Sequence, residues 1–268
     1  MFKKKSHKKI FALATTIALT TVGAFSAVAN ADDPIAIIGA MDVEIEKLLP
    51  EIKNRRDVVL RNHTYHTGTL RGQDVVVTRS GVGKVNAAVT TTELINEFEV
   101  DALIFTGIAG ATAPELDPND VVISTSLVQH DVDLTAFGMK PGHMNGFKDR
   151  FFHADKELIN IANASAIEVV GKERVSLGVI ATGDQFMADK NDVKEVYTEY
   201  AAKAVEMEGA AVAQVAYLYN KPLVVIRTIS DKADGSAQLD YEEMKSVTAH
   251  NSSGITLKML EKIDALDS

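Results

Sequence analysis

Residues 34–52 read PIAIIGAMDVEIEKLLPEI, an apolar run that passes into a segment of helical spacing. The same alternation recurs along the chain and divides it into strand-like runs and helical segments. Strands are expected at residues 34–40, 74–81, 102–111, 120–129, 174–183 and 222–230, and helices at residues 41–52, 84–98 and 241–263. Strands that are apolar throughout are buried on both faces, as in a parallel sheet covered by helices. The sequence therefore predicts a three-layer α/β fold in which helices flank a central, mixed and largely parallel sheet.

The N-terminal segment differs in composition from the rest of the chain. MFKKKSHKK carries five lysines and no acid, a long uncharged run follows, and ANA precedes Asp32. This order indicates a secretory signal peptide over residues 1–31 that is cleaved after Ala31; an uncleaved membrane anchor is the alternative. Residues 32–268 contain no Pro/Gly-rich linker and no internal repeat, so a single domain is expected. The protein is expected to be exported to the periplasm or the cell exterior.

The composition limits the classes of partner. The chain has 268 residues, of which 46% are hydrophobic, and a formal net charge of −9. Removal of the lysine-rich signal peptide would make the remainder more acidic. An acidic surface argues against nucleic acid or an anionic membrane as the main partner, so a small molecule is expected. The chain has no cysteine, so its stability does not depend on the redox state of its compartment.

Two stretches resemble known ligand-binding motifs but lack residues that those motifs require. SGVGKVN, residues 80–86, fails the Walker pattern because Thr78 and Val85 stand where Gly and Ser or Thr are required. DKADGSAQLDY, residues 231–241, fails as a calcium loop: with Gly235 at the sixth position the loop begins at Ser230, and Tyr241 stands at the twelfth position, where Glu is required. The histidines show no zinc spacing, and no G-x-S-x-G elbow occurs. We therefore expect neither a metal nor a cofactor.

Carboxylates follow several of the expected strands. Glu44 comes after the first strand, Glu206 and Glu208 lie at a strand-to-helix transition, and Asp231 ends the last apolar strand. Each alone has an ordinary explanation as a helix-terminal acid, a cap or a turn residue. Because the carboxyl ends of parallel strands meet at one edge of a sheet, together they predict a ligand crevice there. Arg227, inside the last strand, is placed to balance their charge.

Seven segments, taken in order, carry a resemblance to a known family. They are IIGAMDVEIEKLLPEI, SGVGKVNAA, FTGIAGA, HDVDLTAFG, ATGDQFM, AVEMEGAAVAQVA and VVIRTISDKAD. In this order they resemble the 5′-methylthioadenosine/S-adenosylhomocysteine nucleosidases of the nucleoside phosphorylase superfamily, from about Pro34 to the final helix. The resemblance implies a nucleoside phosphorylase-like fold and hydrolysis of the N-glycosidic bond of these two nucleosides. Adenine and a 5-thioribose would be released, and 5′-deoxyadenosine is a further candidate substrate.

The resemblance also implies the roles of individual residues. Asp231 would donate a proton towards N7 of adenine, Glu44 would deprotonate the attacking water, and Glu208 would accept hydrogen bonds from the ribose hydroxyls. Glu206 is expected to support the pocket wall. Further substrate-binding positions would be Val82, Ala109, Gly110, Phe186, Met187, Met207, Arg227, Ser230 and Tyr241. Leu134 and Phe137 match positions that close the pocket of a neighbouring subunit, so a homodimer is implied.

Two positions depart from the family pattern, and three other functions stay open. Ile108 stands where a small hydroxyl residue is expected, and Asp240 precedes Tyr241 where a shorter residue should precede Phe. The alternatives are a purine nucleoside phosphorylase, an aminodeoxyfutalosine nucleosidase and an exported nucleoside-binding protein without turnover. Phosphorolysis needs cations around phosphate, whereas the loops at the strand ends offer one lysine and acids, so hydrolysis is favoured. An exported enzyme would serve salvage or detoxification of extracellular thioadenosines.

Overall fold

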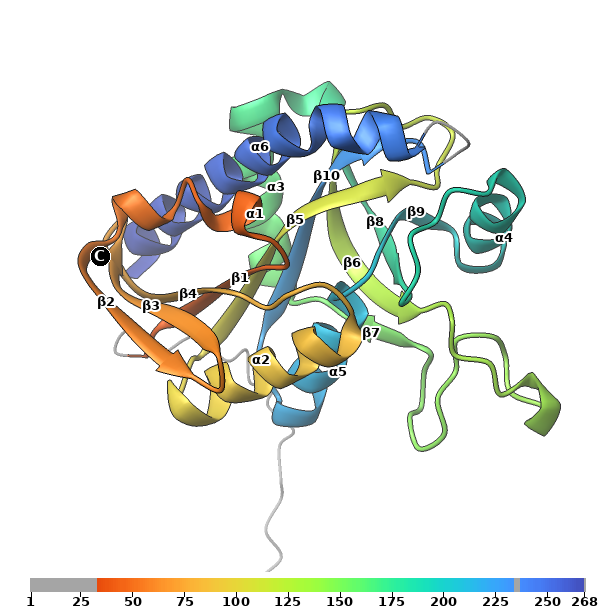
Figure 1. Ribbon diagram of the computed structural model, residues 1–268, viewed down its shortest axis with the longest axis horizontal. Helices are drawn as coiled ribbons and strands as arrows, with labels where there is room; N and C mark the ends of the chain where they lie inside the picture. The colour runs from red at the N-terminus through yellow and green to blue at the C-terminus, as the bar shows by residue number, and fades with distance from the viewer. Residues whose placement is uncertain (1–32, 234–236, 268) are drawn as a thin grey trace, which may run out of the picture.

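The structure is a computed structural model that describes residues 33–233 and 237–267 (Figure 1). The signal peptide expected at residues 1–31 lies outside the described residues, and so does the side chain of Asp240. Within the described part of the chain, no helix combines the length and the apolar character needed to cross a bilayer.

In the described part of the chain, ten strands form one mixed sheet in the order β10-β6-β8-β9-β5-β1-β4-β3-β2, with β7 paired to β6. Their bounds are β1 Ile35–Gly39, β2 Lys53–Leu60, β3 His63–Leu70, β4 Gln73–Arg79, β5 Ala102–Ala111, β6 Val121–Gln129, β7 Phe151–His153, β8 Val175–Thr182, β9 Ala202–Glu206 and β10 Leu223–Asp231. Strand β1 pairs in parallel with β4 and β5, and β5 pairs in parallel with β10. Because β10 also pairs with β6, the strands β5, β10, β6, β8 and β9 close into a barrel.

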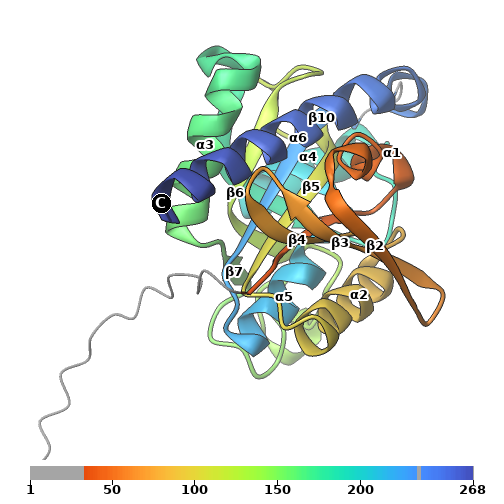
Figure 2. The ribbon, with the colours of Figure 1, turned by 90° about the vertical axis from the view of Figure 1, so that its left-hand side faces the viewer.

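Helices cover both faces of the sheet, as the sequence predicts. Their bounds are α1 Asp42–Ile45, α2 Lys84–Glu97, α3 Lys156–Val170, α4 Lys190–Tyr200, α5 Gly209–Tyr219 and α6 Ala237–Asp267. Figures 1 and 2 show α1, α3 and α6 on one side of the sheet and α2 and α5 on the other. The three-layer α/β architecture with a mixed central sheet is confirmed.

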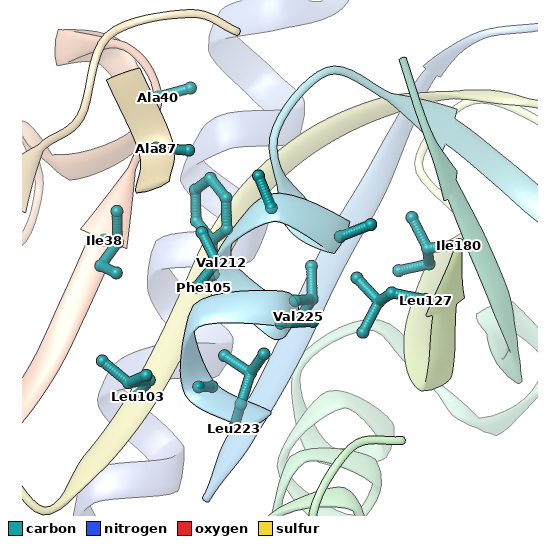
Figure 3. Packing of buried hydrophobic residues seen from close by; sticks show 14 of the residues in the cluster. Ile38, Ala40, Ala87, Leu103, Phe105, Leu127, Ile180, Val212, Leu223 and Val225 are labelled. Atoms are coloured by element: carbon teal, nitrogen blue, oxygen red, sulfur yellow. The ribbon is translucent and has the colours of Figure 1, made fainter. Parts of the chain in front are cut away.

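The core explains why the strands are apolar throughout. Leu103 and Phe105 of β5 pack towards α2 and α5, whereas Ala102 and Ile104 pack towards α3 and α6. Figure 3 shows Phe105 beside Val212 of α5 within the first of these layers. Full burial of each large apolar side chain contributes about 1.5–3 kcal/mol to stability. A strand with two buried faces therefore needs an apolar residue at nearly every position.

Two local expectations are modified by the structure. The helix expected over residues 41–52 is reduced to α1 and a 3-10 turn at Leu49–Glu51, because Pro50 lacks the backbone N–H that a continuous helix needs. Strand β2, which forms a hairpin with β3, was not among the expected strands. It is exposed along almost its whole length, so it carries no apolar run to reveal it.

Candidate active site

A cavity of about 250 Å³ lies at the carboxyl ends of β1, β5, β9 and β10. The predicted crevice at the strand ends therefore exists, and it has the concave, mainly apolar character of a small-molecule site. It is lined by Ala40, Met41, Glu44, Val82, Ile108, Ala109, Gly110, Phe186, Val205, Glu206, Met207, Glu208, Ser230, Asp231 and Tyr241. Within the described residues, no three His, Cys, Asp or Glu side chains are grouped to hold a metal ion.

Glu44 is held rigidly by main-chain donors. One carboxylate oxygen accepts from Ala40 N at 2.6 Å and Met41 N at 2.9 Å, and the other accepts from Ile108 N at 3.0 Å. The residue is 1% exposed. Burial raises the pKa of Glu44, while the positive charge of Arg227 and the three backbone hydrogen bonds act in the opposite direction. The result is a positioned carboxylate that is more basic than an exposed one.

Arg227 lies among the carboxylates, as expected, and forms its shortest ion pair with Glu206 rather than with Glu208. Its Nη2 lies 2.5 Å from Glu206 Oε2 and 3.9 Å from Glu208 Oε2. Glu206 also accepts from Gly209 N at 2.7 Å. The reason is local: Glu206 is still in strand β9, whereas Glu208 is the N-cap residue of α5 with φ −137° and ψ −40°, so the turn separates their carboxylates. Glu206 is thus the more fully paired of the two.

Glu208 has fewer partners and faces the cavity. Its Oε1 accepts from Gly83 N at 2.8 Å, and the residue is 5% exposed. Burial, together with the nearby negative charge of Glu206, raises the pKa of Glu208 to about 8, although Arg227 and Gly83 N oppose the shift. A carboxyl group of this kind is partly protonated near neutral pH, and hydrogen-bond donors from a ligand would favour its ionised form.

Asp231 is the last residue of β10 and is 2% exposed. Its Oδ2 accepts from the Ser230 hydroxyl at 2.7 Å, and its Oδ1 accepts from Ala233 N at 2.8 Å. Gly110 on the neighbouring strand makes room for it, because a Cβ atom there would lie 3.0 Å from Asp231 Oδ1 and 2.9 Å from Ala233 Cβ. Sequence reasoning identified this glycine as a contact residue; the structure shows that it also shapes the wall around the carboxylate.

Aromatic side chains form the outer part of the cavity. Phe186 is 50% exposed, and its ring packs edge-on against Tyr241 with centroids 5.8 Å apart. The Tyr241 hydroxyl lies 3.1 Å from the sulfur of Met41. Burial raises the pKa of Tyr241, so its hydroxyl stays neutral and can serve only in hydrogen bonding and packing. A flat aromatic ligand would find a stacking surface on these rings.

Four of the residues assigned from sequence do not line the cavity. Met187 is buried in the hydrophobic cluster beside β8 and α4, and Arg227 lies behind Glu206. Leu134 and Phe137 belong to the segment after β6 that projects from the body of the molecule, at the right of Figure 1, where Phe137 is 81% exposed. These two were assigned to the pocket of a neighbouring subunit, which stays a prediction.

Sequence reasoning missed three lining residues, namely Ala40, Met41 and Val205. Ala40 and Met41 belong to the GAM segment, which ends three residues before Glu44. The abrupt end of the preceding apolar strand was the feature of the sequence that could have identified them. Val205 lies in β9, directly before Glu206, and has the side chain of an ordinary core residue. Nothing in its type or spacing distinguishes it from a residue that packs inside the sheet.

The chain is similar to known proteins over most of its length. The family model described as Phosphorylase superfamily matches residues 34–261. A 5′-methylthioadenosine/S-adenosylhomocysteine nucleosidase of Anoxybacillus flavithermus is 44% identical over 231 residues, which cover 86% of this chain and 99% of that protein.

Solved structures give the same picture. The 5′-methylthioadenosine/S-adenosylhomocysteine nucleosidase from Neisseria meningitidis, in complex with methylthio-immucillin-A, superposes with a TM-score of 0.83 at 38% identity, covering 86% of this chain and 99% of that chain. The futalosine hydrolase of Helicobacter pylori superposes with a TM-score of 0.79 at 34% identity, covering 86% of this chain and 98% of that chain.

Proposed function

Since the chain belongs to the phosphorylase superfamily and, within it, to the 5′-methylthioadenosine/S-adenosylhomocysteine nucleosidases, we propose that the cavity described above is its active site. The protein hydrolyses the N-glycosidic bond of 5′-methylthioadenosine and S-adenosylhomocysteine and releases adenine. The observation that carries the assignment of the site is the convergence of Glu44, Glu208 and Asp231 on one cavity beside Phe186. Three separate carboxylates suit this reaction, because two of them can each transfer a proton and the third can stabilise the positive charge that develops on the sugar.

In this proposal Asp231 is the general acid. Adenine leaves poorly as an anion, so a proton must reach N7 as the bond between C1′ and N9 breaks. Asp231 sits at the cavity wall with the Ser230 hydroxyl 2.7 Å from one of its oxygens. Phe186 would stack on the purine and so keep N7 within reach of this carboxyl group.

Glu208 is assigned to the sugar. Its two carboxylate oxygens suit the ribose 2′- and 3′-hydroxyls, which are adjacent donors on one face of the ring. Donation from both hydroxyls would favour the ionised form of a group whose pKa is otherwise raised to about 8. The resulting negative charge stabilises the oxocarbenium character that the ribose acquires as the bond breaks.

Glu44 is assigned to the water. As the water oxygen bonds to C1′, Glu44 takes up its proton while Asp231 gives one to the base, so the two transfers balance. The raised pKa of Glu44, which results from burial, makes it a better base than an exposed glutamate. Its hydrogen bonds to Ala40 N, Met41 N and Ile108 N fix its position but do not neutralise it.

The lining of the cavity favours water over phosphate as the attacking group. Its described residues include four acids, Glu44, Glu206, Glu208 and Asp231, and no lysine or arginine. A dianionic phosphate would meet like charge at this site and would lack the cationic donors that phosphorolysis requires. Measuring adenine release from methylthioadenosine with and without phosphate tests the assignment: equal rates are expected, and strict dependence on phosphate would refute it.

A futalosine-type substrate is the second candidate, because the futalosine hydrolase of Helicobacter pylori is similar along 86% of the chain. The shared base and ribose would use the same carboxylates, and only the 5′ substituent would differ. A panel of methylthioadenosine, S-adenosylhomocysteine, aminodeoxyfutalosine, adenosine and inosine ranks these substrates by kcat/KM. The highest value is expected for the two thioadenosines. Tight binding of all five without release of a base would instead indicate a nucleoside-binding protein.

We also propose that the enzyme is a homodimer in which each subunit helps to close the pocket of the other. Two exposed apolar features support this. Val82, Val85 and Val89, which we call the α2 stripe, are 47%, 73% and 45% exposed, and Phe137 on the projecting segment is 81% exposed. Apolar surface of this kind is characteristic of protein contacts. A single monomeric species by light scattering at all concentrations would argue against the dimer.

Finally, we propose that the protein is exported, as its N-terminal sequence indicates. Cell fractionation with immunodetection should find it outside the cytoplasm, and mass spectrometry should find a mature N-terminus at Asp32. An intact Met1 on a cytoplasmic product would refute the proposal. Export would place the enzyme where it meets thioadenosines released from cells, in purine or methionine salvage or in detoxification.

A further inference from the structure

A set of contacts outside the cavity joins three separate segments that surround it. Lys84, the first residue of α2, donates from Nζ to Asp131 Oδ1 at 2.6 Å. Asp131 follows β6 and also accepts at Oδ2 from Asp184 N at 3.0 Å. Asp184 in turn accepts from Lys84 N at 2.8 Å. Each of the three residues thus contacts the other two, and we call this group the clasp.

Each segment held by the clasp contributes to the cavity or to its surroundings. Asp184 precedes Phe186 by two residues, and Gly83, next to Lys84, donates its N–H to Glu208 at 2.8 Å. Val82, on the same turn, lines the cavity. Asp131 begins the projecting segment that carries Phe137. The wall for the base and the partner of the sugar-binding carboxylate are therefore linked through three side chains that do not line the cavity.

The N-terminus of α2 gives the clasp its mechanical role. The N-cap residue is Gly83, with φ +96°, and it has no side chain to cap the helix. The first N–H groups are instead capped by carboxylates from elsewhere in the chain, Glu208 on Gly83 N and Asp184 on Lys84 N. The placement of the Glu208 carboxylate therefore depends on the position of the turn at Gly83. Asp184 helps to fix the position of the same turn, because it accepts from Lys84 N.

The surroundings of the clasp suit a persistent contact. The side chains of Lys84 and Asp131 are 18% and 24% exposed, so water screens their charges only partly. Although burial acts to raise it, the hydrogen bonds from Lys84 Nζ and Asp184 N hold the pKa of Asp131 below its usual value. Asp131 is therefore ionised at neutral pH, as an ion pair with Lys84 requires.

We propose that Asp184, Lys84 and Asp131 are positioning residues for the nucleosidase reaction, which set the placement of Glu208 and of the Phe186 wall without touching the substrate. The proposal rests on the function proposed above. Both placed groups contact the substrate before and during the reaction, so losing the clasp should weaken substrate binding more than it slows the chemical step.

The test compares Asp184→Ala with Asp184→Asn on methylthioadenosine. Alanine removes the acceptor for Lys84 N, whereas asparagine keeps an oxygen there. We expect Asp184→Ala to raise KM about fivefold or more with a smaller change in kcat, and Asp184→Asn to stay within about twofold of the unsubstituted enzyme. Lys84→Met should raise KM in the same direction.

Two matched controls separate positioning from stability. Asp155→Ala removes the carboxylate that caps α3, a helix of 15 residues compared with 14 in α2. Lys221→Met breaks the ion pair with Asp101, whose side chains are exposed to the same degree as those of Lys84 and Asp131. Both controls should lower the melting temperature and leave KM unchanged.

The outcomes are distinct for the two proposals. If Asp184→Ala lowers the melting temperature as Asp155→Ala does but leaves KM unchanged, the positioning role is overturned. If the unsubstituted protein releases no adenine, the proposed function fails instead. In that case the ratio of the Kd values for methylthioadenosine, measured by calorimetry on Asp184→Ala and Asp184→Asn, still tests the clasp: a ratio near one overturns it.

Discussion

The guanidinium group of Arg227 is fully buried among three glutamates and lies over the ring of Phe105, 4.1 Å from its centroid. Burial acts to lower its pKa, but the charges of Glu206, Glu44 and Glu208 outweigh that effect and raise it, so the group stays cationic. One cation therefore serves several carboxylates. Glu206 receives the direct ion pair, which leaves Glu44 and Glu208 with raised pKa values and free to act on a substrate.

Replacing either proton-transferring acid should abolish turnover without unfolding the protein. Glu44→Gln removes the base, and Asp231→Asn removes the acid; each should lower kcat at least about 100-fold. The neutral side chains are similar in size, and their burial carries no charge, which offsets the hydrogen bonds that they lose. Adenine release and the melting temperature should be measured together. Activity close to that of the unsubstituted enzyme in either variant would refute the role assigned to that residue.

Glu208 should make the stability of the protein fall as the pH rises. Its pKa is raised from 4.5 to about 8, so between these pH values the unfolded chain has released a proton that the folded protein still holds. The unfolded state then binds fewer protons, and the free energy of unfolding declines with rising pH across this window. Glu208→Gln removes this contribution, so its melting temperature should fall less between pH 5 and pH 8.

The matched control for this pH series is Glu157→Gln, on the exposed surface of α3. It should reproduce the pH dependence of the unsubstituted protein. Identical slopes for all three proteins would show that Glu208 does not hold a proton in the folded state.

At the level of elements, strands β5 and β10 bring the charges together. Their parallel pairing sets Arg227 opposite Gly107, and β5 then continues to Ile108, whose N–H holds Glu44. A Cβ atom on Gly107 would lie 2.4 Å from both Arg227 Nη1 and Glu44 Oε1. Gly107, the first glycine in TGIAGA, is thus required because a buried cation and a buried acid on two different elements approach it closely.

Gly107→Ala should therefore damage both the fold and the site. Relieving contacts of this length forces Arg227 or Glu44 out of place, which costs about 1–3 kcal/mol of stability. Thermal unfolding and kcat should both decrease. The control is Gly254→Ala in α6, where the nearest atom to a new Cβ lies at 3.7 Å; alanine favours helices, so this variant should be neutral or slightly stabilising. Normal kcat in Gly107→Ala would contradict the arrangement.

The helix α6 shows how a distant element supports the same site. Ser253 donates to the main-chain oxygen of Glu44 at 3.0 Å, and Ser252 donates to that of Gly107 at 2.8 Å. In the sequence these serines lie within an amphipathic segment and look like ordinary helix residues. Their role depends on the packing of α6 across the sheet, which no local pattern reveals.

For the whole molecule, the exposed α2 stripe predicts an effect of charge on assembly. Val85→Glu places a carboxylate in the middle of this apolar surface, so the proposed dimer should dissociate at concentrations where the unsubstituted protein is dimeric. Light scattering after size exclusion measures the mass. Leu266→Glu, near the end of α6, is the control, because Leu266 is 66% exposed and α6 covers the opposite face of the sheet from α2. A dimer of undiminished stability in Val85→Glu would exclude this surface as the contact.

The apolar strands, their alternation with helices, and the positions of Glu44, Glu208 and Asp231 at or after strand ends could all be predicted from the sequence alone. These follow from local rules, since burial on two faces demands apolar residues and parallel strands end at a common edge. Those rules predicted neither the exposed strand β2 nor the shortened helix α1. Strand β2 buries little apolar surface, and the helix is interrupted before Pro50.

How Arg227 is shared among the carboxylates depends on the packing of separate elements and could not be predicted from local sequence. Glu206 and Glu208 are both within 4 Å of Arg227, but the turn at Glu208 directs its carboxylate to Gly83 N, whereas Glu206 forms the short ion pair with Arg227. The clasp of Asp184, Lys84 and Asp131 joins residues far apart in the chain in the same way. Electrostatic and hydrogen-bond partners are set by distances of a few ångströms in space, and such distances arise only when separate elements pack together.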